Sequence, residues 1–232
     1  MATFVLVHGA WSGAHTFRSV RPLLRAAGHE VFTPSLTGLG ERSHLLSPEV
    51  GLTTHVHDVA NVILYEDLDE IVLLGYSYGG SVVTGALEYV AERVRDLVYL
   101  DAFLPKDGQS IDDMLGVNRS AFGLGLTWLV PPIPRTFEDP EVAAFVGSRR
   151  SDQPIRSFVE PVRLSKPLES YDFSRTYIKA TGEPRPAESH PFWEAADRVK
   201  ADDRWRYREI ATNHMIPSNR PAELVGLLLE LV

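Results

Sequence analysis

The chain contains no cysteine among its 232 residues, so it can form neither a disulfide framework nor a thiolate metal site, which fits a reducing compartment. It also has no run of basic residues: 23 Lys and Arg stand against 31 Asp and Glu, and the formal net charge is −8. This balance disfavours nucleic acid and anionic membranes as partners. The amino terminus has no basic lead, and its first apolar run is too short to span a bilayer. We therefore expect a cytoplasmic protein.

The length and composition of the chain are those of one globular domain of the size of an enzyme. A chain of this length with 44% hydrophobic and 23% charged residues can bury a sizeable core. Neither an internal repeat nor a low-complexity tract interrupts it. We expect its partner to be a small molecule, and a homodimer is compatible with the sequence.

Short β-branched or leucine-rich runs alternate with helical patterns along most of the chain. Strands are expected at Thr3–His8, Glu30–Pro34, Ile71–Gly75, Leu97–Asp101, Thr176–Ala180 and Trp205–Ile210. Helices are expected at Phe17–Ala27, Thr54–Tyr65, Tyr78–Arg93, Pro191–Lys200 and Pro221–Leu231. This alternation predicts an α/β fold with a mostly parallel six-stranded sheet and helices on both of its faces.

One segment departs from this rhythm. From residue 104 to residue 170 the strand signals stop, and a stretch of this length cannot be one structureless loop in a compact domain. We therefore predict an α/β core formed by residues 1–103 and 171–232, with an inserted helical cap at 104–170. The apolar residues expected to roof the site are Phe103, Met114, Phe122, Leu124, Leu126, Trp128, Leu129, Phe145 and Phe158.

Ser77 is the candidate nucleophile. It lies in a Gly-x-Ser-x-Gly turn between the apolar run Ile71–Gly75 and a helical pattern. A sharp strand-to-helix turn of this kind strains the central residue and exposes its hydroxyl at the carboxyl end of a sheet, and the flanking glycines, Gly75 and Gly79, avoid Cβ collisions. A glycine-rich connection without catalytic function is the alternative, but the strand before and the helix after favour the catalytic interpretation.

A serine nucleophile needs a base, and eight histidines are available. His214 follows the last predicted strand in a short polar loop before the final helix. Loops at the carboxyl ends of parallel strands converge on one crevice, so this imidazole can face Ser77 although the two residues are far apart in the sequence. His15 could also approach the site but has no evident partner in the sequence. The remaining histidines are interpreted as surface, packing or helix-entry residues, and His8 as an anchor of its own loop.

Two carboxylates fit the third position of a serine, acid, histidine order along the chain. Asp101 ends the strand beside the one that carries Ser77, and Glu183 follows the next strand. A buried aspartate needs a partner such as His214, whereas Glu183 fits an exposed turn equally well. We therefore favour Asp101 as the acid and keep Glu183 as the alternative, although Asp101 could also serve only to cap the turn that follows it.

The negative charge that develops on the carbonyl oxygen during attack by a serine, the oxyanion, needs hydrogen-bond donors. The loop after the first strand contains glycines, so the backbone N–H of Ala10 can point inward beside that of Tyr78 at the start of the helix after Ser77. The aromatic residues Trp11, Phe103 and Trp128 are the candidates for contacts with the substrate. We expect neither a metal nor a cofactor.

Four passages of the chain together resemble the α/β-hydrolase fold: His8–Trp11, Gly75–Gly80, Leu100–Pro105 and His214–Met215. More narrowly, they resemble the branch that holds plant methylesterases, plant hydroxynitrile lyases and their bacterial esterase relatives. The resemblance implies a six-stranded core with a cap inserted before the strand near Thr176. It also implies Ser77 as nucleophile, His214 as base, and Ala10 and Tyr78 as oxyanion donors.

The chain departs from that branch at three places. The lyases carry a threonine after the first-strand histidine and a lysine after the catalytic histidine, whereas this chain has Gly9 and Met215. Without that cation the departing cyanide is not stabilised, so the resemblance favours an esterase. The plant enzymes place their acid after the next-to-last strand, where this chain offers only Glu183, and Asp101 would move the carboxylate to the adjacent strand end.

The expected activity is hydrolysis of a small to medium, hydrophobic carboxylic ester through an acyl-enzyme. Two kinds of alternative stay open. One is other chemistry on the same fold, a hydroxynitrile lyase or a cofactor-free oxygenase that uses His214 as a base. The other is a small-molecule receptor that keeps the fold and the pocket. Ester turnover, cyanide release, oxygen consumption, and saturable binding without turnover distinguish them.

Overall fold

The computed structural model describes residues 1–119 and 128–232. Its main sheet has six strands in the order β2-β1-β3-β4-β7-β8, and every neighbouring pair is parallel. The strands are β1 Thr3–Val7, β2 Glu30–Phe32, β3 Ile71–Tyr76, β4 Val94–Leu100, β7 Ser174–Ala180 and β8 Trp205–Ile210. The six-stranded α/β fold predicted from the sequence is confirmed, with shifted ends for several strands.

The register of the sheet brings the ends of the central strands to one edge. Val7 pairs with Gly75, Tyr76 with Leu100, and Leu100 with Ile178. Strands β1 and β3 are almost wholly buried and nearly all apolar, as expected for parallel strands covered on both faces. The residues that follow these strands therefore emerge side by side.

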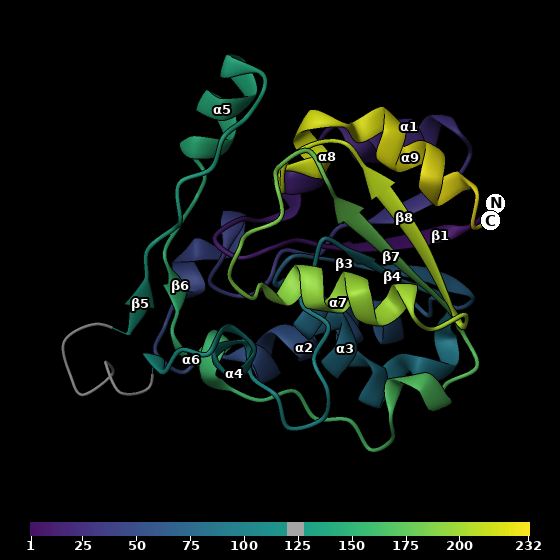
Figure 1. Ribbon diagram of the computed structural model, residues 1–232, viewed down its shortest axis with the longest axis horizontal. Helices are drawn as coiled ribbons and strands as arrows, with labels where there is room; N and C mark the ends of the chain where they lie inside the picture. Colours follow the sequence, from purple (N-terminus) through teal and green to yellow (C-terminus); the bar gives the residue numbers. More distant parts are fainter. Residues whose placement is uncertain (120–127) are drawn as a thin grey trace.

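Helices cover both faces of the sheet (Figure 1). One face carries α1 Val20–Ala26, α8 Ile216–Asn219 and α9 Pro221–Leu229, and the other carries α2 Leu52–Tyr65, α3 Gly79–Val90 and α7 Pro191–Lys200. Short 3₁₀ turns lie at Ala14–Phe17, Gly40–Leu45, Ala91–Arg93 and Leu168–Ser170. Alternate strand residues feed two separate hydrophobic clusters, Val5 and Leu73 in one, Phe4 and Leu74 in the other.

The segment between β4 and β7 contains helices, as expected, and also two short strands. Its elements are α4 Ile111–Leu115, β5 Leu129–Val130, α5 Pro140–Gly147, β6 Gln153–Pro154 and α6 Arg156–Val159. The extended chain on either side of α5 pairs as a short antiparallel ribbon, with Leu129 opposite Pro154. In Figure 1, α5 stands out from the sheet domain on this ribbon. Phe122, Leu124 and Leu126 lie outside the described residues, and the boundaries 104–170 stay a prediction.

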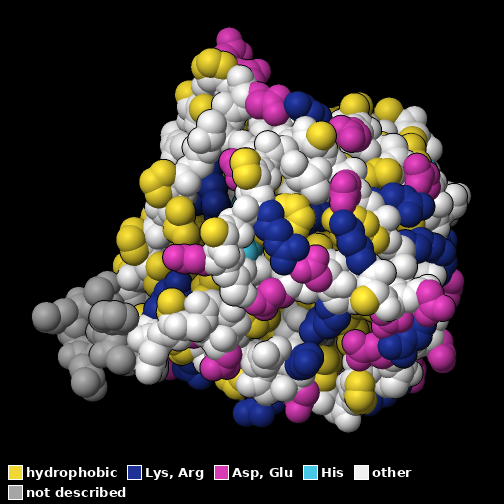
Figure 2. Space-filling view, in the orientation of Figure 1, with side chains coloured by type: hydrophobic (Ala, Val, Ile, Leu, Met, Phe, Trp, Pro, Cys, Tyr) yellow, Lys and Arg dark blue, Asp and Glu magenta, His cyan; other side chains and the backbone are white. Residues whose placement is uncertain are grey.

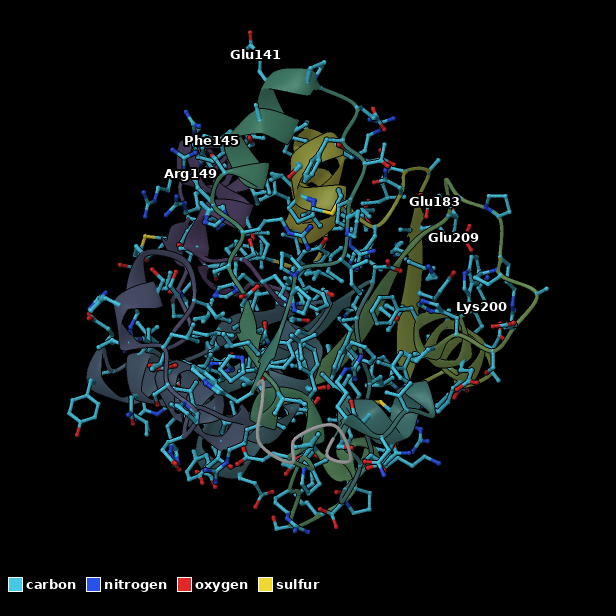
Figure 3. All side chains as sticks on the ribbon, turned by 90° about the vertical axis from the view of Figure 1, so that its left-hand side faces the viewer. Glu141, Phe145, Arg149, Glu183, Lys200 and Glu209 are labelled. Carbon is cyan, nitrogen blue, oxygen red and sulfur yellow. The ribbon has the colours of Figure 1, made fainter. Side chains whose placement is uncertain are left out.

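We call residues 128–155 the arm. Its root is fixed by Trp11, whose indole Nε1 donates to Val130 O (2.8 Å) and whose N–H donates to Gln153 Oε1 (2.8 Å). Near its tip, Phe145 lies under the guanidinium groups of Arg18 (4.3 Å) and Arg149 (3.8 Å). Figure 3 shows Glu141 pointing outward, farther from the sheet domain than Phe145 and Arg149. The arm is thus held close to the loop that follows β1.

A second set of polar contacts ties the arm to the end of the chain. Glu138 pairs with Arg220 (2.5 Å) and accepts from Thr212 (3.2 Å), while Asn213 donates to Thr136 O (3.0 Å). Exposed hydrophobic side chains gather along the arm at the left of Figure 2, and Ile133 is one of the exposed apolar residues there. No helix within the described ranges is long and apolar enough to cross a membrane.

Candidate active site

Ser77 occupies the turn between β3 and α3 in a strained backbone conformation, with φ at +56°. The two glycines beside it are required by close approach. A Cβ on Gly75 would lie 2.6 Å from Gly79 O, and one on Gly79 would lie 2.6 Å from Val7 O. The N–H of Ser77 donates to Leu100 O at the end of β4 (3.2 Å), and the N–H of Phe103, just beyond that strand, donates to Ser77 O (3.1 Å). This is the geometry expected of a serine nucleophile presented at the carboxyl end of a parallel sheet.

His214 faces Ser77 across this edge. Its Nε2 lies 3.0 Å from Ser77 Oγ. The imidazole is stacked between the rings of Tyr76 (5.0 Å) and Phe192 (5.3 Å). The Tyr76 hydroxyl also donates to His214 O (2.8 Å), so both the ring and the backbone of the histidine are held in place. The sequence did not point to either aromatic neighbour.

Asp101 lies on the far side of the imidazole. Its Oδ2 is 2.6 Å from His214 Nδ1, and the residue is buried in a left-handed conformation with φ at +41°. Glu183 is exposed, and within the described residues it makes no hydrogen bond to His214. The structure therefore brings together Ser77, His214 and Asp101, and leaves Glu183 outside this hydrogen-bonded chain.

Lys179 adds a fourth member that sequence reasoning missed. Its Nζ donates to Asp101 Oδ1 (2.6 Å) and to Ala180 O (2.8 Å), and lies 4.3 Å from the ring centre of Trp193. The side chain is almost fully buried in β7. A lysine inside an apolar strand needs a buried anion nearby, and this was the available signal in the sequence.

Burial and neighbouring charges set the protonation states of His214 and Asp101. Burial lowers the pKa of His214 from its usual value, and this effect exceeds the opposing hydrogen bond and charge of Asp101. Burial alone would raise the pKa of Asp101, but the hydrogen bond and charge of His214 and the charge of Lys179 outweigh it, so the pKa of this carboxyl is lowered. Near neutral pH the imidazole is therefore a neutral base beside an ionised carboxylate.

Two backbone N–H groups near Ser77 are available to an oxyanion. Across residues 1–119 and 128–232, neither the N–H of Ala10 nor that of Tyr78 donates a hydrogen bond. The loop that holds Ala10 is anchored by His8, which accepts from the N–H of Leu36 (3.1 Å) and contacts Gly9 O (2.8 Å). Burial lowers the pKa of His8 to about 4, so this anchor stays neutral near pH 7.

The pocket that opens on Ser77 is small, about 30 Å³, room for a water or two, so a substrate would have to displace its lining side chains. Its lining residues are Gly9, Ala10, Trp11, Ser12, Thr16, Tyr76, Ser77, Arg135, Val146, Arg150, His214, Met215 and Ser218. Trp11 thus lies where a substrate contact was expected. Neither Phe103 nor Trp128 is among the described lining residues of this pocket: the Phe103 ring packs against Phe192 (4.8 Å), and Trp128 O accepts from the N–H of Ile155 (2.8 Å).

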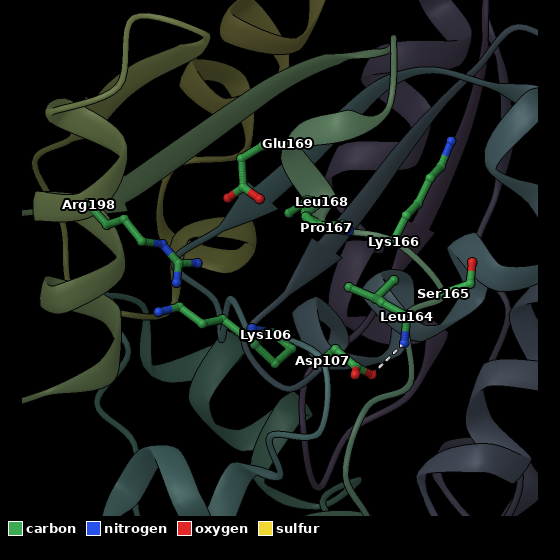
Figure 4. Close-up of a pocket in the computed structure, with 10 residues that line it drawn as sticks. Lys106, Asp107, Leu164, Ser165, Lys166, Pro167, Leu168, Glu169 and Arg198 are labelled. Carbon is green, nitrogen blue, oxygen red and sulfur yellow. Dashed lines mark hydrogen bonds between the residues drawn. The ribbon is translucent and has the colours of Figure 1, made fainter.

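A larger cavity, about 420 Å³, lies away from this chemistry (Figure 4). It is lined by Pro105, Lys106, Asp107, Leu164, Ser165, Lys166, Pro167, Leu168, Glu169 and Arg198. No member of the hydrogen-bonded chain around Ser77 lines it, so its size does not make it the reaction site. Among the described residues, no group of three His, Asp or Glu side chains could hold a metal ion.

Comparison with known proteins agrees with the fold. The profile of the alpha/beta hydrolase family matches residues 4–227. An extracellular alpha/beta-hydrolase from a Paenibacillus species superposes with a TM-score of 0.80 at 26% identity, covering 100% of this chain and 99% of the other.

Curated relatives match over a shorter length. A carbendazim hydrolyzing esterase from Nocardioides sp. is 50% identical over 115 residues, which cover 50% of this chain and 48% of the relative. Methylesterase 1 from Arabidopsis thaliana is 31% identical over 113 residues, covering 44% and 40%. The chain thus spans about half or less of the length of the curated relatives it matches. The family profile, in contrast, covers nearly the whole chain, and the chain belongs to the alpha/beta hydrolase family.

Proposed function

We propose that this chain is a serine hydrolase that cleaves a small to medium carboxylic ester through an acyl-enzyme. The observation that carries the proposal is the continuous hydrogen-bonded chain from Ser77 through His214 to Asp101. The esterase and methylesterase names among the curated relatives support the same chemistry. A cytoplasmic location stays a prediction of the sequence, and the Paenibacillus relative is described as extracellular.

In the proposed first step, Ser77 Oγ attacks the ester carbonyl while its proton passes to His214 Nε2. The N–H groups of Ala10 and Tyr78 stabilise the negative charge that develops on the carbonyl oxygen. The C–O bond to the alcohol then breaks, and the alcohol leaves with the proton from His214. Asp101 holds the imidazole so that Nδ1 keeps its hydrogen and Nε2 faces Ser77.

In the second step, water takes the place of the alcohol. His214 removes a proton from the water as it attacks the acyl-enzyme, and the proton then returns to Ser77 as the carboxylic acid is released. Each proton moves between His214 Nε2 and the oxygen of Ser77, of the leaving alcohol or of the attacking water, so the ester and water are the only reactants.

The experiment is a side-by-side assay with 4-nitrophenyl butyrate, mandelonitrile and an acidic heteroaromatic compound under oxygen. The proposal requires 4-nitrophenolate and butyrate in equal amounts, at a rate far above that in buffer. Cyanide release without ester turnover would identify a lyase, and oxygen consumption without ester turnover would identify an oxygenase. Saturable binding of the ester with negligible turnover of all three would identify a receptor.

Replacing Lys179 by methionine is expected to lower kcat/KM about 10- to 100-fold at neutral pH, because Asp101 loses a charged hydrogen bond that fixes one of its oxygens. The acid limb of the pH profile is expected to move to higher pH. The charges that face His214 come from Asp101, Arg135 and Lys179, and the lysine lowers the pKa of this imidazole. Removing that cation favours the protonated imidazole, so the base becomes available only at higher pH.

The matched control is Lys200→Met. Lys200 forms an exposed pair with Glu209 (3.0 Å), and it lies outside the hydrogen-bonded chain; both residues are labelled in Figure 3. This variant is expected to keep its kcat/KM within about twofold, since exposed ion pairs contribute little. An unchanged acid limb in the Lys179 variant, with only a lower Tm, would reduce Lys179 to a structural residue.

A further inference from the structure

Two arginines from the arm line the pocket that opens on Ser77. Arg135 and Arg150 both contribute to its wall, and Arg135 also lines the hollow on the Asp101 side of His214. Neither is paired with a carboxylate in the part of the chain that the structure describes. The eight residues at 120–127 contain no Asp or Glu, so they cannot supply the missing carboxylate either.

Arg150 is half-buried in this position. Its Nη1 donates to Ile133 O (2.5 Å), and its guanidinium lies 5.9 Å from the Trp11 ring centre. Burial lowers the pKa of Arg150, and the nearby charge of Arg135 lowers it further. A half-buried guanidinium such as that of Arg150, beside the like charge of the exposed Arg135, is unfavourable unless an anion compensates it.

The rest of the pocket lacks any such anion. Its described lining contains two arginines and a histidine but no Asp or Glu, although the chain as a whole has 31 acidic against 23 basic residues. Trp11, Val146 and Met215 supply apolar walls beside the arginines. Once its lining side chains are displaced, the walls of this pocket of about 30 Å³ suit a molecule with an apolar body and a negative end.

We propose that the substrate is an ester that carries a second, free carboxylate, a half-ester of a dicarboxylic acid. This inference rests on the proposed esterase function. The ester carbonyl would lie at Ser77, and the remote carboxylate would lie against Arg135 and Arg150. A guanidinium offers paired N–H donors that match the two oxygens of a carboxylate, which gives both affinity and orientation.

The test compares 4-nitrophenyl pentanoate with mono-4-nitrophenyl glutarate, which have the same five-carbon acyl chain and differ in the terminal carboxylate. We expect the ratio of kcat/KM for the glutarate to that for the pentanoate to exceed one in the natural protein. Arg135→Gln and Arg150→Gln should each lower this ratio about tenfold or more, and 0.5 M NaCl should lower it in the natural protein.

Arg149→Gln is the matched control. It removes the same charge from the same arm, but Arg149 stacks on Phe145 and donates to Phe145 O (2.9 Å) instead of lining the pocket. The ratio should stay within about twofold in this variant. A natural protein that prefers the pentanoate, or an equal fall of the ratio in the Arg149 variant and the two pocket variants, overturns the inference.

A failure of the esterase proposal would be visible separately, as hydrolysis of neither ester above its own rate in buffer. The anion site is then judged by calorimetric binding of glutarate itself. Binding that weakens tenfold or more in Arg135→Gln and Arg150→Gln, but not in Arg149→Gln, supports the site. No binding by the natural protein, or equal binding by all three variants, rejects it.

Discussion

Replacing Ser77 by alanine is expected to lower kcat for ester hydrolysis by about 10⁶-fold, the loss typical when a serine nucleophile is removed from an intact triad. The reason is that the substitution removes the hydroxyl that lies 3.0 Å from the base, His214 Nε2. The residual rate would come from substrate binding and the oxyanion donors. Initial rates with 4-nitrophenyl butyrate, at enzyme concentrations that cover six orders of magnitude, measure the effect.

Ser81→Ala is the control for this substitution. Ser81 is a buried serine in α3, and its Oγ has no hydrogen-bond partner within the described residues. Its removal should leave kcat within about twofold, since no interaction is lost. A Ser77 variant that keeps more than a tenth of the natural kcat would show that another group performs the attack.

Replacing Asp101 by asparagine is expected to lower kcat by about 10⁴-fold. The asparagine amide can donate to His214 Nδ1, which would leave the hydrogen on Nε2 and remove the acceptor that Ser77 needs. The same change leaves Lys179 buried without its carboxylate, so a lower Tm should accompany the loss. Rate and thermal unfolding are measured on the same preparation to separate the two effects.

Glu183→Gln distinguishes the two acids. Glu183 is exposed, and no hydrogen bond within the described residues joins it to His214, so its kcat should stay within about twofold. Loss of turnover in the Glu183 variant, with activity kept in Asp101→Asn, would move the acid to the loop after β7 and reverse the assignment.

The sequence predicted the site best where the backbone geometry permits only particular residue types. The turn at Ser77 needs glycines at fixed offsets because a Cβ at Gly75 or Gly79 would collide with backbone, and this requirement is visible as a motif. His214 was found because the carboxyl ends of parallel strands converge. The choice between Asp101 and Glu183 needed coordinates, since both follow strands and only tertiary packing decides which one reaches the imidazole.

The site residues that the sequence did not reveal are brought to the site by the fold from distant parts of the sequence. Lys179 reaches Asp101 from an adjacent strand, and Arg135 and Arg150 reach the pocket from the arm. The ribbon of β5 and β6 was missed because two-residue strands carry no periodicity. Phe103 was expected to contact the substrate as one of the apolar residues that roof the site, and in the structure its ring packs against Phe192 (4.8 Å).

The central claim is that His214 and Asp101 make the Ser77 hydroxyl unusually nucleophilic. Intact mass after exposure to an alkyl fluorophosphonate tests it most directly, with peptide mapping of the modified site. We expect one adduct per natural chain, on Ser77, a strongly slowed reaction in His214→Gln, and none in Ser77→Ala. An unlabelled natural protein, or equal labelling of the natural chain and the Ser77 variant, would contradict the account.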